Sequence, residues 1–301
     1  MSEVSDDAAA LVALLRLSSH GLTWPQIAAE VAEAGGALPV WRRYAVEPPA
    51  LFDLREDPLV QATADLQRWR GQGITVLTVV DAAYPAQLRE IHEMPPILFC
   101  RGNLVAAERG VSVVGSRSAD ENALSFAREV TRGLVARELA VLSGLARGVD
   151  TAAHTEALAA GGRTVAFLGT GILGSYPAEN RALQERIARD GLLVSQFWPE
   201  APPQKHTFPM RNAVMSGYGR ATVVVTAGET SGTRTQARFA VEHGRPVILH
   251  ASVARGTSWG RALTSRPGVY VASNPDDALA VVDDVTRPLS DTLDGLLAPL
   301  L

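Results

Sequence analysis

The order of hydrophobic and polar residues divides the chain into two parts. In the first 72 residues, Leu11, Leu14 and Leu15 recur at the spacing of one helical face, and Thr23 can cap a second helix. A third helix is expected over residues 57–70. From Gly73 onward, amphipathic stretches alternate with short apolar runs, which are residues 74–80, 111–114, 140–143, 164–168, 192–195, 221–226 and 246–249.

Runs that are apolar throughout are typical of strands covered by helices on both faces of a sheet. Their alternation with helical stretches predicts an α/β fold with a doubly wound, mainly parallel sheet. We expect a helical module over residues 1–72, an α/β domain over residues 73–284 and a tail over residues 285–301.

Composition is that of a globular protein, with 47% hydrophobic and 20% charged residues among 301. No apolar run approaches the ~20 residues that a membrane helix needs. Asp6 and Asp7 stand where a secretory signal would carry positive charge. The single cysteine, Cys100, permits no internal disulfide and no cysteine-based metal site. These features predict a soluble, cytoplasmic protein that does not enter a membrane.

Charge is distributed unevenly along the chain. The net charge is −4, yet residues 101–245 carry 17 Lys and Arg against 13 Asp and Glu. The basic residues are 27 arginines and one lysine, Lys205. Arginine grips phosphate oxygens in a planar fork and stacks on bases, so the central region is a candidate for binding polyanions.

Glycine-rich turns follow four of the expected strands. Ligands of an open parallel sheet bind beyond the carboxyl ends of its strands, where glycine lets the backbone approach an anion closely. Although such turns favour glycine in any case, four on one edge, three of them with arginine, predict a phosphate-binding cradle. Its candidate residues are Gly115, Ser116, Arg117, Gly144, Arg147, Gly148, Gly169, Thr170, Gly171, Ser231, Gly232, Thr233 and Arg234.

Nucleotide-cofactor motifs do not fit this chain. The run from Gly169 to Gly174 matches G-x-G-x-x-G, but Ser175-Tyr176-Pro177 follows where a helix should continue, and no acidic residue ends the next strand. No G-x-x-x-x-G-K-[ST] sequence is present. We therefore expect no nicotinamide cofactor and no P-loop nucleotidase, and no other cofactor is indicated.

Candidates for catalysis are few. Asp150 and His154 are four residues apart on one expected helix face, but no further ligands complete a metal site. A first-turn aspartate and a partly buried histidine are the simpler interpretation. No G-x-S-x-G elbow is present. We predict neither a catalytic residue nor a metal.

Residues 202–212 combine a proline-rich loop with an aromatic and polar groups. Lys205, Phe208, Arg211 and Asn212 are the candidates here. An aromatic ring beside cations can hold a single nucleic-acid strand by base stacking and phosphate pairing. Phe208 is equally suited to fill the core under the loop.

Several motifs, in a consistent order from about Gly73 to Val247, resemble the DNA-processing protein A family, also called DprA or Smf. The motifs are Asp81-Ala82-Ala83-Tyr84-Pro85, Arg101-Gly102-Asn103-Leu104, Val113-Val114-Gly115-Ser116-Arg117, Ser143-Gly144-Leu145-Ala146-Arg147-Gly148-Val149-Asp150 with His154, and Phe208-Pro209 with Arg211-Asn212.

The resemblance implies an extended Rossmann domain after a helical module of SAM or helix-hairpin-helix type. It also implies sequence-independent binding of single-stranded DNA, a homodimer, and help in loading a RecA-type recombinase during DNA uptake. Carried over residue by residue, the binding role falls on Gly115, Ser116, Arg117, Arg147, Arg211 and Asn212, with Lys205 added by its charge and position.

Departures from the family pattern begin at Val225. Residues 225–236 replace the family's glutamate–alanine pair and serine–glycine–serine turn, and His250-Ala251 stands where a proline–glycine turn is usual. The region that pairs subunits in the family is therefore altered. Gly232 to Gln236 also resembles the G-T-x-x-E of nucleotide phosphoribohydrolases, but Gln236 cannot ionise. A non-catalytic sensor of a nucleotide derivative is the alternative function, and a subunit-interface scaffold is a third.

Overall fold

The computed structural model describes residues 5–17, 21–45 and 57–287. Four helices form the N-terminal module: α1 (Asp6–Arg16), α2 (Trp24–Glu33), α3 (Ala37–Tyr44) and α4 (Pro58–Gly71). Side chains cap the first turns of α1 and α4, since Ser5 accepts from Ala8 N and Asp57 accepts from Leu59 N. The carboxylate of Asp7 accepts from Ala37 N and Leu38 N and thereby ties α1 to the start of α3.

One sheet of nine strands runs through the part of the chain after residue 57, in the order β1-β2-β6-β5-β4-β3-β7-β8-β9. Pairing is antiparallel between β1 and β2 and between β2 and β6, and parallel elsewhere. The strands are β1 (Thr75–Thr78), β2 (Ile97–Gly102), β3 (Gly110–Gly115), β4 (Ala140–Ser143), β5 (Thr164–Phe167), β6 (Leu192–Ser195), β7 (Ala221–Thr226), β8 (Val247–His250) and β9 (Val269–Ala272).

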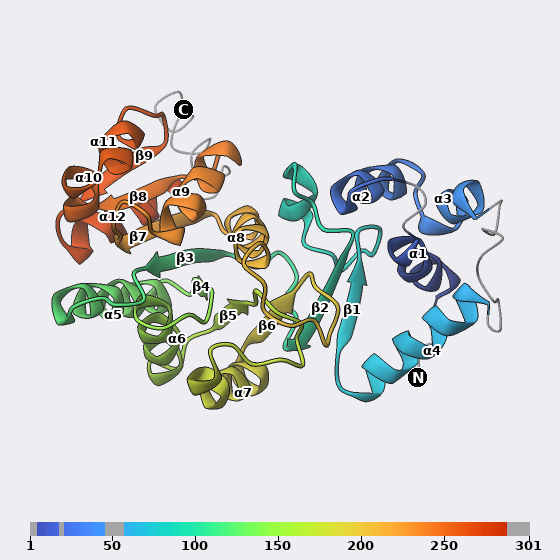
Figure 1. Ribbon diagram of the computed structural model, residues 1–301. Helices are drawn as coiled ribbons and strands as arrows, with labels where there is room; N and C mark the ends of the chain where they lie inside the picture. Colours follow the sequence, from blue (N-terminus) through green and yellow to red (C-terminus); the bar gives the residue numbers. More distant parts are fainter. Residues whose placement is uncertain (1–4, 18–20, 46–56, 288–301) are drawn as a thin grey trace, which may run out of the picture.

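Helices cover both faces of the sheet (Figure 1). On one face, α5 (Glu121–Ala136), α6 (Val149–Ala159) and α12 (Pro275–Thr286) share an apolar core with β3, β4 and β7. On the other face lie α8 (Thr207–Tyr218) and α9 (Gly232–Glu242). The remaining elements are η1 (Ala86–Glu90), η2 (Ala178–Asn180), α7 (Arg181–Asp190), α10 (Ala251–Gly256) and α11 (Ser258–Leu263). The predicted doubly wound, mainly parallel α/β fold behind a helical module is confirmed.

Aromatic packing joins the helical module to the sheet. Trp69 of α4 stacks on Trp198 with ring centroids 5.9 Å apart, and it meets Phe99 of β2 edge-on at 5.2 Å. The guanidinium of Arg16 lies 5.2 Å from the centroid of Trp198. One hydrophobic core therefore continues across the predicted boundary between residues 72 and 73. Two separate domains stay a prediction.

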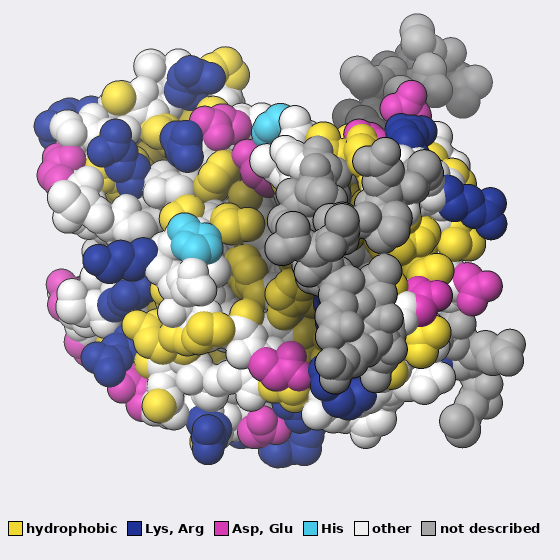
Figure 2. Space-filling model, turned by 45° about the vertical axis from the view of Figure 1, so that its right-hand side comes forward, with side chains coloured by type: hydrophobic (Ala, Val, Ile, Leu, Met, Phe, Trp, Pro, Cys, Tyr) yellow, Lys and Arg dark blue, Asp and Glu magenta, His cyan; other side chains and the backbone are white. Residues whose placement is uncertain are grey.

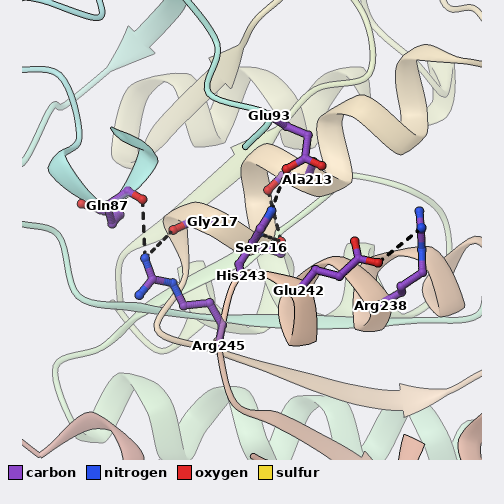
Figure 3. Close-up of polar contacts among 9 residues, drawn as sticks. All are labelled: Gln87, Glu93, Ala213, Ser216, Gly217, Arg238, Glu242, His243 and Arg245. Carbon is purple, nitrogen blue, oxygen red and sulfur yellow. Dashed lines mark hydrogen bonds and ion pairs between the residues drawn. The ribbon is translucent and has the colours of Figure 1, made fainter. Parts of the chain in front are cut away.

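Polar contacts hold α8 and α9 against each other and against the loop before β2 (Figure 3). His243 Nδ1 lies 2.7 Å from Ser216 Oγ of α8, and its Nε2 lies 2.9 Å from the carboxylate of Glu93. Arg245 donates to the carbonyls of Gln87 and Gly217 at 3.5 Å. These contacts set the spacing of two helices that wall the cavity described below.

Several elements differ from the sequence-based expectation. No helix was expected at residues 206–212, whereas α8 begins at Thr207 and has Pro209 in its first turn, where proline is tolerated. α12 ends at Thr286 and so crosses the predicted boundary after residue 284. Of the predicted tail, residues 288–301 lie outside the described residues.

Candidate functional site

A cavity of about 440 Å³ lies where the strand order reverses. β3 has parallel neighbours on both sides, β4 and β7, so the turns that follow their carboxyl ends diverge and leave a crevice. Nine predicted residues line this cavity: Gly115, Ser116, Arg117, Phe208, Arg211, Asn212, Ser231, Gly232 and Thr233. The structure thus brings together most of the candidate residues in three segments, 115–117, 208–212 and 231–234, at the switch point, which is the place where the strand order reverses.

The first wall is the turn from Gly115 to Arg117. A Cβ atom on Gly115 would lie 2.5 Å from Cγ2 of Val149, and one on Gly148 would collide with the carbonyl oxygen of Ser116. Gly148 also has φ +70°, a left-handed value that other residues rarely adopt. The turn can therefore pack closely on the start of α6 and leave the Arg117 side chain exposed.

The second wall is the start of α9. Ser231 caps the helix, because its Oγ accepts from Thr233 N at 3.2 Å. The first turn of a helix presents amides that lack carbonyl partners and carries partial positive charge, which attracts an anion. Arg234, also predicted, is exposed on the same helix but does not line the cavity.

At the cavity floor, Arg211 and Asp150 are both buried. Arg211 Nη1 donates to the carbonyl oxygens of Gly144 and Phe167, while its Nε donates to Asn212 Oδ1 at 2.9 Å. The Asp150 carboxylate accepts from the amides of Gly144 and Ala146 at 3.2 Å. Much of the Arg211 guanidinium is thus engaged by the protein's own carbonyls.

Burial governs the electrostatics of this floor. Desolvation raises the pKa of Asp150, an effect that Arg211 opposes. Desolvation lowers the pKa of Arg211, which Asp150 opposes in turn. The neighbouring His154 is fully buried, and desolvation, reinforced by Arg211, lowers its pKa to about 3. His154 is therefore neutral at physiological pH.

Aromatic side chains form a rim beside the cavity. The Arg117 guanidinium lies 5.7 Å from the ring centroid of Phe208, and Tyr176 packs against Phe208 with centroids 5.5 Å apart. Phe208 is half-buried over Gly169, whereas Tyr176 and Met210 are exposed. Phe208 therefore has features of both expected roles, core packing and base stacking. One part of its ring covers Gly169, and the residue also lines the cavity.

Other predicted residues lie apart from this cavity. Arg147 forms an ion pair with Glu179 and, with Gly148, lines a separate hollow of about 400 Å³ beside α5 and α6. Gly169, Thr170 and Gly171 are buried, and Gly171 N donates to Ala201 O at 2.8 Å. Gly144 is buried beneath Arg211, and Lys205 is exposed just before α8. On the face in Figure 2, several Lys and Arg side chains stand along the α/β side of the molecule.

Sequence reasoning missed some residues of the cavity. Gln236 lines it from α9, and Thr230 and Gly228 line it from the preceding turn. Asp150, which the sequence indicated as structural, also reaches it. The available signal was periodicity, since Gln236 is one helical turn after Thr233 on the same face of α9.

Within the described residues, no helix is long and apolar enough to cross a bilayer. No group of three or more His, Cys, Asp or Glu side chains is placed to hold a metal ion in that same part of the chain.

Comparison with known proteins matches residues 75–283 to the model of the family described as DNA recombination-mediator protein A. DNA processing protein DprA of Streptococcus pneumoniae is 38% identical over 205 residues, which are 67% of this chain and 72% of that protein. The putative DNA processing protein DprA of Mycobacterium tuberculosis is 33% identical over 246 residues, which are 77% of this chain and 63% of that protein.

Solved structures agree with the fold. DNA processing protein A from Streptococcus pneumoniae superposes with a TM-score of 0.71 at 30% identity and covers 93% of this chain and 98% of that one. DNA processing protein A from Helicobacter pylori, whose single-stranded DNA binding mode has been studied structurally, has a TM-score of 0.62 at 21% identity and covers 69% and 95% of the two chains.

Proposed function

Since the chain belongs to the DNA recombination-mediator protein A family, we propose that it binds single-stranded DNA at the β3 switch point and acts in recombination as a binding protein, without catalysing a reaction. The observation that carries this proposal is the cavity itself. The Gly115 turn, with the exposed Arg117, and the start of α9 form two walls of a cavity of about 440 Å³, and the aromatic rim lies beside this cavity. The study of single-stranded DNA binding by the Helicobacter pylori relative supports the same ligand class.

In the proposed complex, phosphates contact the turn from Gly115 to Arg117 and the amides from Ser231 to Thr233. Bases stack on the rim formed by Phe208 and Tyr176, where every base offers a face and sequence matters little. Lys205 and Arg234 are exposed near the two walls and extend the path of the backbone. Arg147 can contact a phosphate only if DNA displaces Glu179 from its ion pair with Arg147.

Finer assignments rest on the family alone. We propose a homodimer that hands single-stranded DNA to a RecA-type recombinase in the cytoplasm during DNA uptake. Sedimentation of the free protein tests the homodimer. A pull-down of purified recombinase in the presence of DNA tests the recombinase as a partner. A monomer at micromolar concentration, or no recombinase retained, contradicts the respective assignment.

Arg117→Ala is expected to weaken binding of oligothymidine about tenfold, because it removes an exposed phosphate and stacking contact. If the protein neutralises about three to five phosphates, a plot of log affinity against log salt concentration has a slope of about −0.7 for each phosphate. The variant should lose the contribution of one phosphate, so its slope should be shallower by about 0.7. Fluorescence anisotropy with labelled oligothymidine over a salt series measures both quantities.

The matched control is Arg186→Ala, an exposed arginine of α7 that does not line the cavity. It removes the same charge and should leave the affinity and the slope near those of the parent protein. Equal behaviour of the two variants contradicts the site. A protein that binds no oligothymidine, yet is stabilised by nucleotides or ADP-ribose in a thermal-shift screen, is instead the nucleotide-derivative sensor.

A further inference from the structure

A second cavity, of about 380 Å³, lies at the opposite end of the parallel strands. It is lined by Glu108, which comes just before β3, and by Arg220, which comes just before β7. These are the amino ends of two strands whose carboxyl ends border the switch point. β7 has six residues, which at about 3.3 Å per residue place the two cavities roughly 17 Å apart. Among the residues that the structure describes, the two cavities share none.

Apolar side chains make up much of the lining of this second cavity. Residues 82–86 and 104–107 supply most of them, including the buried ring of Tyr84. Leu104 and Val105 are 39% and 47% exposed, although both are large and apolar. Exposed apolar surface within a concave site is suited to the apolar part of a ligand.

Two arginines supply unsatisfied donors to the same cavity. Arg220 is exposed, and its guanidinium has no hydrogen-bond or ion-pair partner within the described residues. Arg245 is mostly buried and uses Nη2 for its contacts with the carbonyls of Gln87 and Gly217 (Figure 3). Its Nε is buried without a partner among the described residues. The protein therefore leaves hydrogen-bonding capacity unused at both guanidinium groups.

The carboxylates of the cavity do not balance its arginines. Glu108 is held by Arg163, which is outside the lining and donates to both carboxylate oxygens, at 2.5 and 2.7 Å. Glu90 pairs with Arg245 at 2.7 Å, but its side chain is 64% exposed, and such pairs are weak. Arg89 donates to three backbone carbonyls and to no carboxylate of the described residues. Three guanidinium groups thus face one available carboxylate, so the cavity favours an anion.

We propose that this cavity binds a small organic anion, with a phosphate or carboxylate head on Arg220 and Arg245 and an apolar body against Leu104 and Val105. A guanidinium fork can donate two parallel hydrogen bonds to either head. A neutral ligand leaves the two arginines unpaired, and a bare phosphate leaves the apolar lining in water. The volume of about 380 Å³ is within the range of small-molecule sites. The site is separate from the proposed DNA site and does not rest on it.

Ligand-observed NMR titration with four probes tests the ligand class. Phenyl phosphate and benzoate carry an anionic head on an apolar ring. Benzyl alcohol keeps the ring without the charge, and inorganic phosphate keeps the charge without the ring. At least one of the two aromatic anions should bind the wild-type protein about tenfold more tightly than benzyl alcohol and inorganic phosphate, because only an aromatic anion satisfies both parts of the cavity. The tighter of the two identifies the head group.

Variants locate the bound probe. Arg220→Ala should weaken binding of the better aromatic anion about tenfold, because it removes an unpaired guanidinium. Val105→Asp adds a negative charge to the apolar lining and should weaken binding to a similar extent. Both positions are exposed, so the thermal midpoints should stay near that of the parent protein. Arg266→Ala, an exposed arginine that lines neither cavity, is the matched control, and Arg117→Ala should also keep the probe.

Binding of oligothymidine separates this proposal from the proposed function, since Arg220→Ala should bind oligothymidine as the wild type does. The anion site is wrong if no probe binds, or if benzyl alcohol or inorganic phosphate binds as tightly as the aromatic anions. It is also wrong if Arg220→Ala keeps the probe, whether Arg117→Ala loses it or Arg220→Ala instead weakens oligothymidine. A wild-type protein that binds an aromatic anion but no oligothymidine contradicts only the proposed DNA binding.

Discussion

Arg211→Met is expected to lower the free energy of unfolding by about 3–5 kcal/mol, because it removes a buried guanidinium together with its hydrogen bonds and leaves the buried Asp150 without a nearby positive charge. The guanidinium donates to the carbonyls of Gly144 and Phe167, at the carboxyl ends of β4 and β5, and faces the buried carboxylate of Asp150. Without it these acceptors are left unpaired. At roughly 2–4 °C per kcal/mol for a domain of this size, thermal unfolding should shift down by about 6–20 °C.

Two companion variants make this result specific. Arg238→Met removes an exposed arginine that pairs with Glu242 in an i,i+4 contact and lies over the ring of Phe239, and it should change stability by less than about 0.5 kcal/mol. Adding Asp150→Asn to Arg211→Met should recover part of the loss, since the orphaned carboxylate is then neutral. A stable Arg211→Met protein with weakened DNA binding contradicts the structural role and assigns Arg211 to the ligand.

The sheet was predictable where strands are buried on both faces. β4, β6 and β7 have the bounds that their uninterrupted apolar runs predict. β9 was missed because Tyr270 and Val271 are exposed at the sheet edge, so the run lacks the signature of a covered strand. α8 was missed because Pro209 and Gly217 resemble loop residues, although the first lies in the opening turn and the second packs against Ile91.

The location of the candidate cavity followed from topology, but the contacts of each arginine did not. Parallel strands bring the turns after β3 and β7 to the same edge, so Gly115 and Ser231 could be placed together from sequence. The pairing of Arg147 with Glu179 joins residues 32 positions apart, and the burial of Arg211 depends on carbonyls 44 and 67 positions away. Such long-range contacts have no local signature in the sequence. The sequence could therefore not distinguish an arginine that is free to bind a ligand from one that already contacts other parts of the protein.

Acidification from pH 7.5 to pH 5 is expected to lower the free energy of unfolding by about 2 kcal/mol through His154 alone. The folded protein holds the pKa of this fully buried imidazole at about 3, against an ordinary value of 6.5. Below pH 6.5 the unfolded chain therefore binds a proton that the folded chain refuses. Stability from this residue is complete above pH 6.5, declines by up to about 1.4 kcal/mol per pH unit and reaches its floor near pH 3. Urea denaturation at half-unit pH intervals measures the slope.

His154→Leu is the decisive comparison, because it removes the titrating group and leaves an apolar side chain at a fully buried position. The variant loses the contact of Nδ1 with Thr164 Oγ1 at 2.7 Å and should be less stable at pH 7.5, yet its stability should vary less between pH 7.5 and 5. His206→Gln, an exposed substitution, should keep the parent slope. The raised pKa of Asp150 acts with the opposite sign, so the contribution of His154 is taken from the difference between the slopes of the parent and of His154→Leu. If His154→Leu retains the parent slope, another group governs the acid response and the imidazole at position 154 is reached by protons in the folded state.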